Sequence, residues 1–172
     1  MLSRPAADEF GGHFGTYINL VADRSVLEQL EDNRRNATAL FAKLTDEEAN
    51  FRYAPDKWSL KEVLGHLADT ERVMSYRMLR IARGDTTPLP GFDQDSYISN
   101  ADFTASTVER LLADYEAVRA STVSLIRSIP AEAWTRKGTA SNTEMSARAF
   151  AYVIAGHELH HLSIVRDRYL SA

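Results

Sequence analysis

The chain places three of its five histidines in one short stretch, Gly156-His157-Glu158-Leu159-His160-His161. His157 and His161 are four residues apart, and in a helix this spacing puts both imidazoles on one face. That face is otherwise apolar, and a buried imidazole without partners loses its water and gains nothing in return. Two imidazoles one turn apart are a common way for a helix to bind zinc, nickel, copper or iron. The apolar positions are Ala147, Phe150, Ile154 and Ile164.

Two histidines do not make a firm metal site, so a third ligand must come from elsewhere in the chain. His13 lies among glycines and is expected to be solvated. His66 lies in a predicted helix, in the row beside its buried stripe, where a side chain can reach across a bundle. We therefore predict that His66, His157 and His161 hold a divalent metal. Zinc or nickel is favoured, because a facial iron site would want a carboxylate in place of one histidine.

The residues from His157 to His161 also match the H-E-x-x-H pattern of zinc peptidases, in which the glutamate is the general base. Those enzymes take their third ligand downstream, whereas only eleven residues follow His161 and none is a histidine. Peptidase activity is therefore disfavoured, as is a purely structural role for two histidines in one apolar stripe. His160 lies about 100° around the helix from His161, so it is expected to flank or support the site.

The composition is that of an ordinary globular chain, with 172 residues of which 44% are apolar and 26% charged. The net charge of −4, with no basic block, argues against a nucleic-acid or membrane partner. No cysteine is present, which excludes disulfides, thiolate ligands and a cysteine nucleophile. No apolar stretch is long enough to span a bilayer, and Met1–Thr16 lacks a secretory pattern, so a cytoplasmic location is expected.

Apolar residues recur at intervals of three and four in four segments, which predicts four long amphipathic helices. We expect them at about 17–44, 60–83, 108–129 and from near Thr143 or Ser146 to almost the end of the chain. Ser59–Glu62 and Ser106–Glu109 have the pattern of capping boxes, and Gly84 is expected to end the second helix. Between the third and fourth helices, Pro130–Trp134 is expected to form a short helical turn and 135–142 a loop.

The connection from Gly84 to Phe103 has no helical period and contains two prolines, so it is expected to be a long loop that is functional or mobile. About twenty extended residues reach ~60 Å. A 25-residue helix is only ~37 Å long, so the second and third helices can run parallel with this loop crossing the bundle. The prediction is an all-α fold, a four-helix bundle in a single domain covering 1–172.

Within that loop, Gly91–Tyr97 is a second place where chemistry could occur. Asp93 and Asp95 resemble the start of a calcium loop, although the glycine and final glutamate of an EF-hand are missing. A turn whose aspartates cap backbone groups explains them at least as well. Alternatively, the loop is a lid whose Phe92 and Tyr97 line a pocket. Outside this loop, Trp58 is expected to pack on the core, and Arg77, Arg80 and Arg83 to form a solvated face.

Taken together, three segments resemble the DinB-like superfamily, in particular its YfiT-related branch of metal-dependent hydrolases. They are Lys57–Leu67, Leu89–Asp95 and Ala155–His161. The resemblance covers nearly the whole chain and implies an up-down-down-up four-helix bundle. It also implies a metal held by one histidine on the second helix and an H-x-x-x-H pair on the fourth, which are His66, His157 and His161 here.

About chemistry the resemblance implies less. Members include thiol-dependent S-transferases that use bacillithiol or mycothiol, and a mycothiol-dependent maleylpyruvate isomerase. We therefore expect a divalent metal and a low-molecular-weight thiol as cofactors, with a small-molecule substrate and a homodimeric assembly. Hydrolysis of a small molecule is the alternative, and a non-catalytic module stabilised by metal is a further one. The sequence assigns no catalytic or thiol-binding residue.

Overall fold

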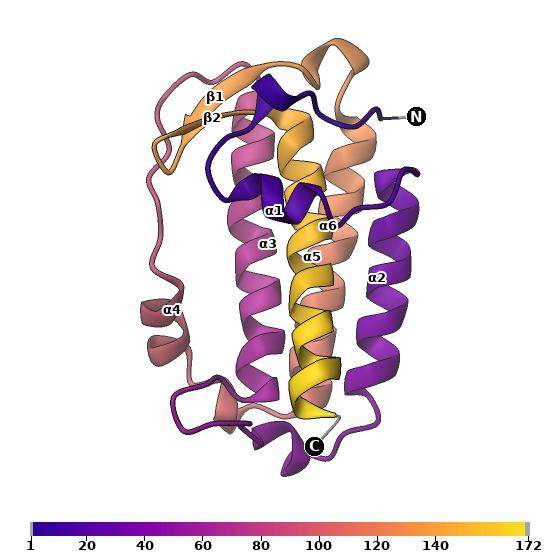
Figure 1. Ribbon diagram of the computed structural model, residues 1–172, viewed down its shortest axis with the longest axis vertical. Helices are drawn as coiled ribbons and strands as arrows, with labels where there is room; N and C mark the ends of the chain where they lie inside the picture. The colour runs from indigo at the N-terminus through magenta and orange to yellow at the C-terminus, as the bar shows by residue number, and fades with distance from the viewer. Residues whose placement is uncertain (1, 171–172) are drawn as a thin grey trace.

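The computed structural model describes residues 2–170, which form a four-helix bundle (Figure 1). The predicted all-α bundle is therefore confirmed. The ends of the predicted domain, Met1, Ser171 and Ala172, lie outside the described residues. A π-helical segment, Val165–Tyr169, continues the last long helix. The four long helices are α2 (Val26–Phe41), α3 (Leu60–Ala82), α5 (Val108–Ser128) and α6 (Ala147–Ile164).

The helices follow the unusual path expected from the long connection. In Figure 1, α2 and α6 run in one direction while α3 and α5 run in the other, so the second and third long helices are parallel. The chain between them travels the length of the bundle on its outside. α3 packs against both α5 and α6, which makes it the helix whose side chains can meet those of either neighbour.

Two segments expected to be irregular are ordered, so both predictions were wrong. The connection between α3 and α5 contains α4 (Gln94–Ala101), and Leu89 forms a parallel bridge with Ala140. The predicted loop 135–142 instead contributes β1 (Lys137–Ala140), which pairs in antiparallel fashion with β2 (Thr143–Ser146). Strands of four residues are too short to show a clear alternation, so periodicity could not identify them.

The amino-terminal part also differs from the single helix expected from about Tyr17. A short helix, α1 (Phe14–Ile18), precedes α2 and is separate from it. The guanidinium of Arg4 donates hydrogen bonds to the carbonyls of Ile18 and Val21, at 2.8 and 2.9 Å. These bonds tie Arg4 to the last residue of α1 and to the turn that follows it. The chain can therefore turn here and lay α1 across α6.

The caps of α3 are as predicted, whereas that of α5 is not. Ser59 Oγ accepts a hydrogen bond from the Glu62 amide, and Glu62 accepts one from the Ser59 amide, which completes a capping box. Gly84 ends the helix with a φ of +83°. At α5 the cap is Thr107, one residue later than predicted, and it bonds the Arg110 amide. Because arginine cannot accept in return, no capping box forms there.

The core consists of two apolar clusters, one toward each end of the bundle. The first includes Met74, Met78 and the α6 residues 149–155, and the second includes Leu60, Leu64 and Leu67 of α3 and Leu162 of α6. Between them, α3, α5 and α6 contribute a layer of buried polar side chains. These are His66, Thr70, Glu71, Arg119, His157 and Glu158. Among the helices that the structure describes, none is long and apolar enough to cross a membrane.

Candidate metal centre

The three histidines predicted as ligands converge in this polar layer. His66 Nε2 lies 3.0 Å from His157 Nε2, which lies 3.1 Å from His161 Nε2. All three candidate ligand atoms are within 4.8 Å of one another. A tetrahedral ion with Zn–N bonds of ~2.0–2.1 Å would need nitrogens ~3.3 Å apart, close to these separations. The bundle therefore brings together residues that are 91 positions apart in sequence.

Hydrogen bonding alone cannot satisfy this cluster. The Nε2 atom of a neutral imidazole carries either one hydrogen or one lone pair, so it makes one good hydrogen bond in the ring plane. His157 Nε2 faces two others, those of His66 and His161, and at least one of the three nitrogens is left without a proper partner. A metal ion accepts a lone pair from all three at once. The donor set therefore fits a divalent cation.

The surroundings keep these histidines in the neutral form that metal ligation requires. Burial lowers the pKa of His66 to about 4. Burial, followed by the influence of His66 and His160, lowers the pKa of His161 to about 3. The same kinds of effect, with burial the largest, lower the pKa of His157 well below its ordinary value. At neutral pH, all three imidazoles can offer lone pairs.

Side chains around the cluster fix the orientation of the rings. Thr70, one turn after His66 on α3, places its hydroxyl 3.3 Å from His66 Nδ1 and so helps to leave Nε2 directed at the cluster. Trp58 packs against His66 with ring centroids 4.6 Å apart and stacks on His161 at 6.2 Å. Trp58 also packs against the apolar core, as predicted, but it covers the candidate site as well.

Tyr17 of α1 is a residue that sequence reasoning missed. Its ring packs edge-on against His157 and His160, with centroids 5.3 and 5.6 Å away. Gly156 permits this approach, because a Cβ there would lie 1.9 Å from the Tyr17 carbonyl oxygen. A glycine inside a helix costs about 1 kcal/mol relative to alanine and often marks such a close contact. Gly156 was the available signal for a segment packed on this face.

The remaining histidines lie outside the cluster. His160 is partly exposed, and its ring packs on Tyr17 and His161 at the flank of the cluster, in agreement with its helical phase. His13 is exposed at the start of α1, as predicted. It lines one side of a cavity that His157 also lines, so it is closer to the candidate site than its position in the sequence indicates.

Glu158 is not placed to act as the general base of a peptidase. Its carboxylate accepts hydrogen bonds from Tyr115 and from Arg119, the latter at 2.6 Å. The Arg119 guanidinium also donates three hydrogen bonds to Glu71, the shortest at 2.8 Å, and one to the Leu30 carbonyl at 2.6 Å. This group of four side chains, which we call the Arg119 cluster, is buried beside the histidines. The H-E-x-x-H match is therefore coincidental.

A cavity of about 150 Å³ adjoins the histidines on the side of α1. Phe92 lines it, as expected if the connection between α3 and α5 is a lid, whereas Tyr97 is largely exposed and contacts Phe92 from outside. Asp93 instead caps α4 through the amides of Asp95 and Ser96, which supports the turn interpretation. The lining residues are His13, Phe14, Tyr17, Thr70, Met74, Arg77, Phe92, Gln94, Ser141, Val153 and His157.

The prediction that Arg77, Arg80 and Arg83 form a solvated face was wrong for Arg77. Arg77 is only 2% exposed, whereas Arg83 is exposed and Arg80 is half-buried and pairs with Asp85. Arg77 lies three residues after Met74 and four before Ile81, both buried. It therefore belongs to the inward row of α3, and the i, i+3 spacing of the arginines concealed this.

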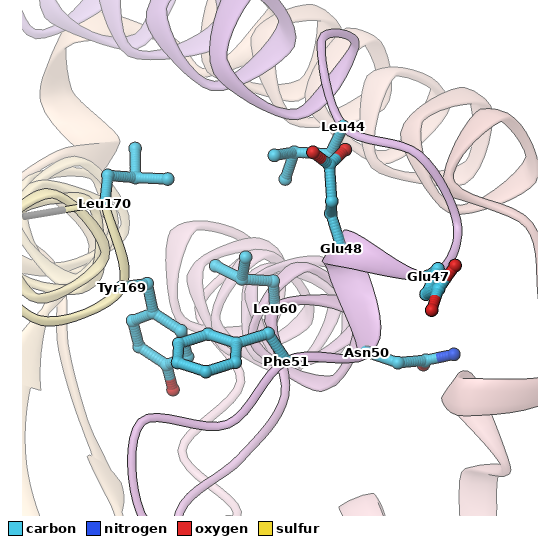
Figure 2. A pocket seen from close by; sticks show the side chains of 8 residues that line it. All are labelled: Leu44, Glu47, Glu48, Asn50, Phe51, Leu60, Tyr169 and Leu170. Atoms are coloured by element: carbon cyan, nitrogen blue, oxygen red, sulfur yellow. The ribbon is translucent and has the colours of Figure 1, made fainter. Parts of the chain in front are cut away.

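A larger cavity lies near the carboxyl-terminal end of α6, about 620 Å³ in volume. Figure 2 shows its walls, where the Tyr169 and Phe51 rings lie near Leu60 and Leu170. Glu47, Glu48 and Asn50 line its rim, and no histidine is among the described residues around it. The candidate metal centre is thus associated with the smaller cavity, where polar groups converge.

The fold agrees with the comparisons to known proteins. A family model described as DinB superfamily matches residues 29–165, so the chain belongs to this superfamily. A protein of Oceanobacillus iheyensis named "Putative metal-dependent hydrolase OB0413" is 28% identical over 142 residues, 81% of each chain. The predicted resemblance to this family is confirmed.

The fold itself is similar to a solved structure of YfiT from Bacillus subtilis. That protein is described as "a probable metal-dependent hydrolase with an unusual four-helix bundle topology". The structural match has a TM-score of 0.74 and covers 93% of this chain and 98% of YfiT, at 15% sequence identity. It bears on the fold, including the parallel arrangement of α3 and α5.

Proposed function

We propose that this chain is a divalent-metal-dependent enzyme in which His66, His157 and His161 hold the ion. The observation that carries the proposal is the convergence of three neutral Nε2 atoms, two of them on buried histidines and that of His161 on a partly buried one, that cannot satisfy one another. The names of the relatives from Oceanobacillus and Bacillus support it. Zinc and nickel are the favoured ions, because both accept three imidazoles and an exchangeable fourth ligand.

A bound divalent ion would supply Lewis-acid chemistry and lower the pKa of a water or thiol beside it. The chain's own residues position and enclose this centre. Thr70 orients His66, Trp58 covers His66 and His161, and Tyr17 covers His157 from α1. The small cavity beside His157 gives a substrate a place to bind next to the ion.

Two reactions suit such a centre, and the residues around it favour thiol transfer. Among the described residues, no carboxylate joins the three histidines, and Glu158 is held by Arg119. A hydrolase therefore lacks a side-chain base for its water. A thiol has an ordinary pKa near 8.5 and needs less help to lose its proton than water does. The chain has no cysteine, so the thiol would be a low-molecular-weight cosubstrate. Hydrolysis, to which the relatives' names point, is the alternative.

The metal part of this proposal is tested by elemental analysis of protein purified without a metal-affinity tag. We expect about one equivalent of zinc or nickel per chain, either as purified or after incubation with the two ions. Failure to retain either ion would overturn the proposal. His157→Ala should remove both metal and activity; if activity survives the loss of metal, the ion serves stability alone.

The choice of reaction is tested by conjugation assays with bacillithiol, mycothiol and glutathione against a panel of small electrophiles. We expect at least one thiol to react faster with the metal-loaded protein than with the metal-free protein. Equal rates with all three thiols would eliminate thiol transfer. Ester and amide substrates tested on the same preparations would then decide whether the alternative, hydrolysis, holds.

A further inference from the structure

Arg77 carries a buried positive charge that no negatively charged group among the described residues offsets. Its Nη2 donates to the Pro90 carbonyl at 2.7 Å and to Ser141 Oγ at 3.0 Å, while Nη1 lies 3.6 Å from Met74 Sδ. Within residues 2–170, no carboxylate lies within ion-pairing distance of this guanidinium. Arginine remains protonated in proteins, and a buried charge without a counter-ion is costly. This cost indicates that the buried charge has a function.

Three separate segments hold the guanidinium in place. Arg77 comes from α3, and the Phe92 ring from the connection lies 5.7 Å from its Cζ. Ser141 comes from the tip of the β1–β2 hairpin, where Ser141 and Asn142 both have positive φ, at +50° and +61°. A two-residue hairpin turn between paired strands favours positive φ at both positions, so this geometry is the one expected for the β1–β2 loop. The turn places Ser141 Oγ beside Arg77.

The guanidinium lies on the wall of the cavity that reaches the histidines. Arg77, Met74 and Thr70 line the cavity from one face of α3, and His157 lines it from α6. His66 and Arg77 are eleven residues apart on α3, while the cavity that Arg77 lines also reaches His157. The cavity that Arg77 and His157 both line is small, about 150 Å³, so the enclosed part of a ligand is small as well.

We propose that Arg77 binds the carboxylate of a small organic-acid substrate whose reacting end lies at the three-histidine centre. This assignment rests on the proposed metal-dependent function and specifies its substrate class. The cavity lining contains one arginine and no lysine among the described residues, so its single fixed charge matches a monoanion. A planar carboxylate suits the flat guanidinium fork, whereas a phosphate dianion usually collects several cationic or amide donors.

The test is a calorimetric titration of the metal-free and the zinc-loaded protein with butyrate, butyramide and inorganic phosphate. We expect butyrate to bind more tightly than butyramide, even without zinc, because Arg77 is not one of the proposed metal ligands. The comparison uses the unmodified chain and needs no variant. Equal affinities for butyrate and butyramide would overturn the inference, as would tighter binding of phosphate than of butyrate.

Variants then assign the effect to Arg77. Arg77→Gln should weaken butyrate binding by ~10–100-fold, the usual size of a charge-assisted hydrogen bond, while leaving butyramide binding nearly unchanged. Arg77→Lys, which keeps the charge, should lose less. Arg83→Gln, on the exposed end of the same helix, is the matched control and should bind butyrate as the unmodified chain does. Equal butyrate affinity in Arg77→Gln and Arg83→Gln would contradict the assignment.

These outcomes separate the inference from the proposed function. If the protein binds zinc but butyrate binding is independent of Arg77, the metal centre stands and the substrate class is wrong. If Arg77-dependent butyrate binding is found in a protein that retains no metal, the anion site stands and the proposed enzyme fails.

Discussion

The polar layer of the bundle contains two clusters, which differ in how far their polar groups find partners in the described part of the chain. In the Arg119 cluster, the guanidinium meets Glu71, Glu158 and a backbone carbonyl, and Tyr115 donates to Glu158. Burial opposes the charge on Arg119, but Glu158 and Glu71 raise its pKa well above the ordinary value. In the histidine cluster, three Nε2 atoms face one another and lack enough partners.

This difference separates a structural cluster from a functional one. Adjacent residues of α6, His157 and Glu158, serve different clusters because they point about 100° apart around the helix. The cluster that is satisfied within the chain joins α3, α5 and α6. The histidine cluster, which residues 2–170 do not satisfy by hydrogen bonding, is the one for which we propose a ligand from outside the chain. Arg77 is similar to the second kind, since burial lowers its pKa and no carboxylate in the described part of the chain lies close enough to raise it again.

The largest expected effect is on the satisfied cluster. Arg119→Met leaves Glu71 and Glu158 buried without their cation and should destabilise the protein by about 3–5 kcal/mol. Arg127→Met, at an exposed position of the same helix, should change stability by less than about 0.5 kcal/mol. Urea unfolding of the metal-free proteins measures both. Equal stability of the two variants would mean that the Arg119 cluster contributes little to folding.

Metal binding should stabilise the protein through the histidine cluster alone. Zinc binds the folded chain and should raise its unfolding free energy by about 2.7 kcal/mol at a hundredfold excess over the dissociation constant. Arg127→Met should gain the same amount, whereas His66→Ala should gain almost nothing. Thermal unfolding with and without zinc shows the difference. An equal gain in His66→Ala would place the zinc somewhere other than the histidine cluster.

A smaller effect is expected where α1 covers the histidines. Gly156→Ala brings a Cβ against the Tyr17 carbonyl and should cost about 1–3 kcal/mol through forced repacking. Amides of residues 14–18 should then exchange with solvent faster, while those of α5 should change little. Ser163→Ala, on the exposed face of α6, is the control. Unchanged exchange at residues 14–18 would show that α1 is not held at Gly156.

The bundle and the histidine cluster could be predicted because both follow from helical periodicity. Four segments repeat at three and four, and the i, i+4 spacing of His157 and His161 sets their common face. The parallel course of α3 and α5 could also be predicted, since the extended connection between them is longer than a helix and can cross the bundle. The homodimer, the location in the cytoplasm and the thiol cofactor stay predictions.

What could not be predicted depends on contacts between distant segments. Arg119 and Glu71 have charged side chains, which are ordinarily exposed, and only their pairing across helices permits burial. The hairpin is held by hydrogen bonds between Leu89 and two of its residues, Thr139 in β1 and Ser141 in the turn, which no local pattern reveals. Tyr17 lies on a helix of five residues whose position depends on Gly156. The burial of Arg77 could have been predicted, because its spacing from Met74 and Ile81 places it in the buried row of α3.

The most direct test of the metal centre is a zinc titration of three histidine variants. His66→Ala and His161→Ala each leave two imidazoles and should lose the metal almost completely, although the two positions lie on different helices. His160→Ala should lose no more than about 10–100-fold in affinity, because it contacts the cluster only from its flank. Retention of zinc by His161→Ala, together with its loss from His160→Ala, would contradict the site proposed here.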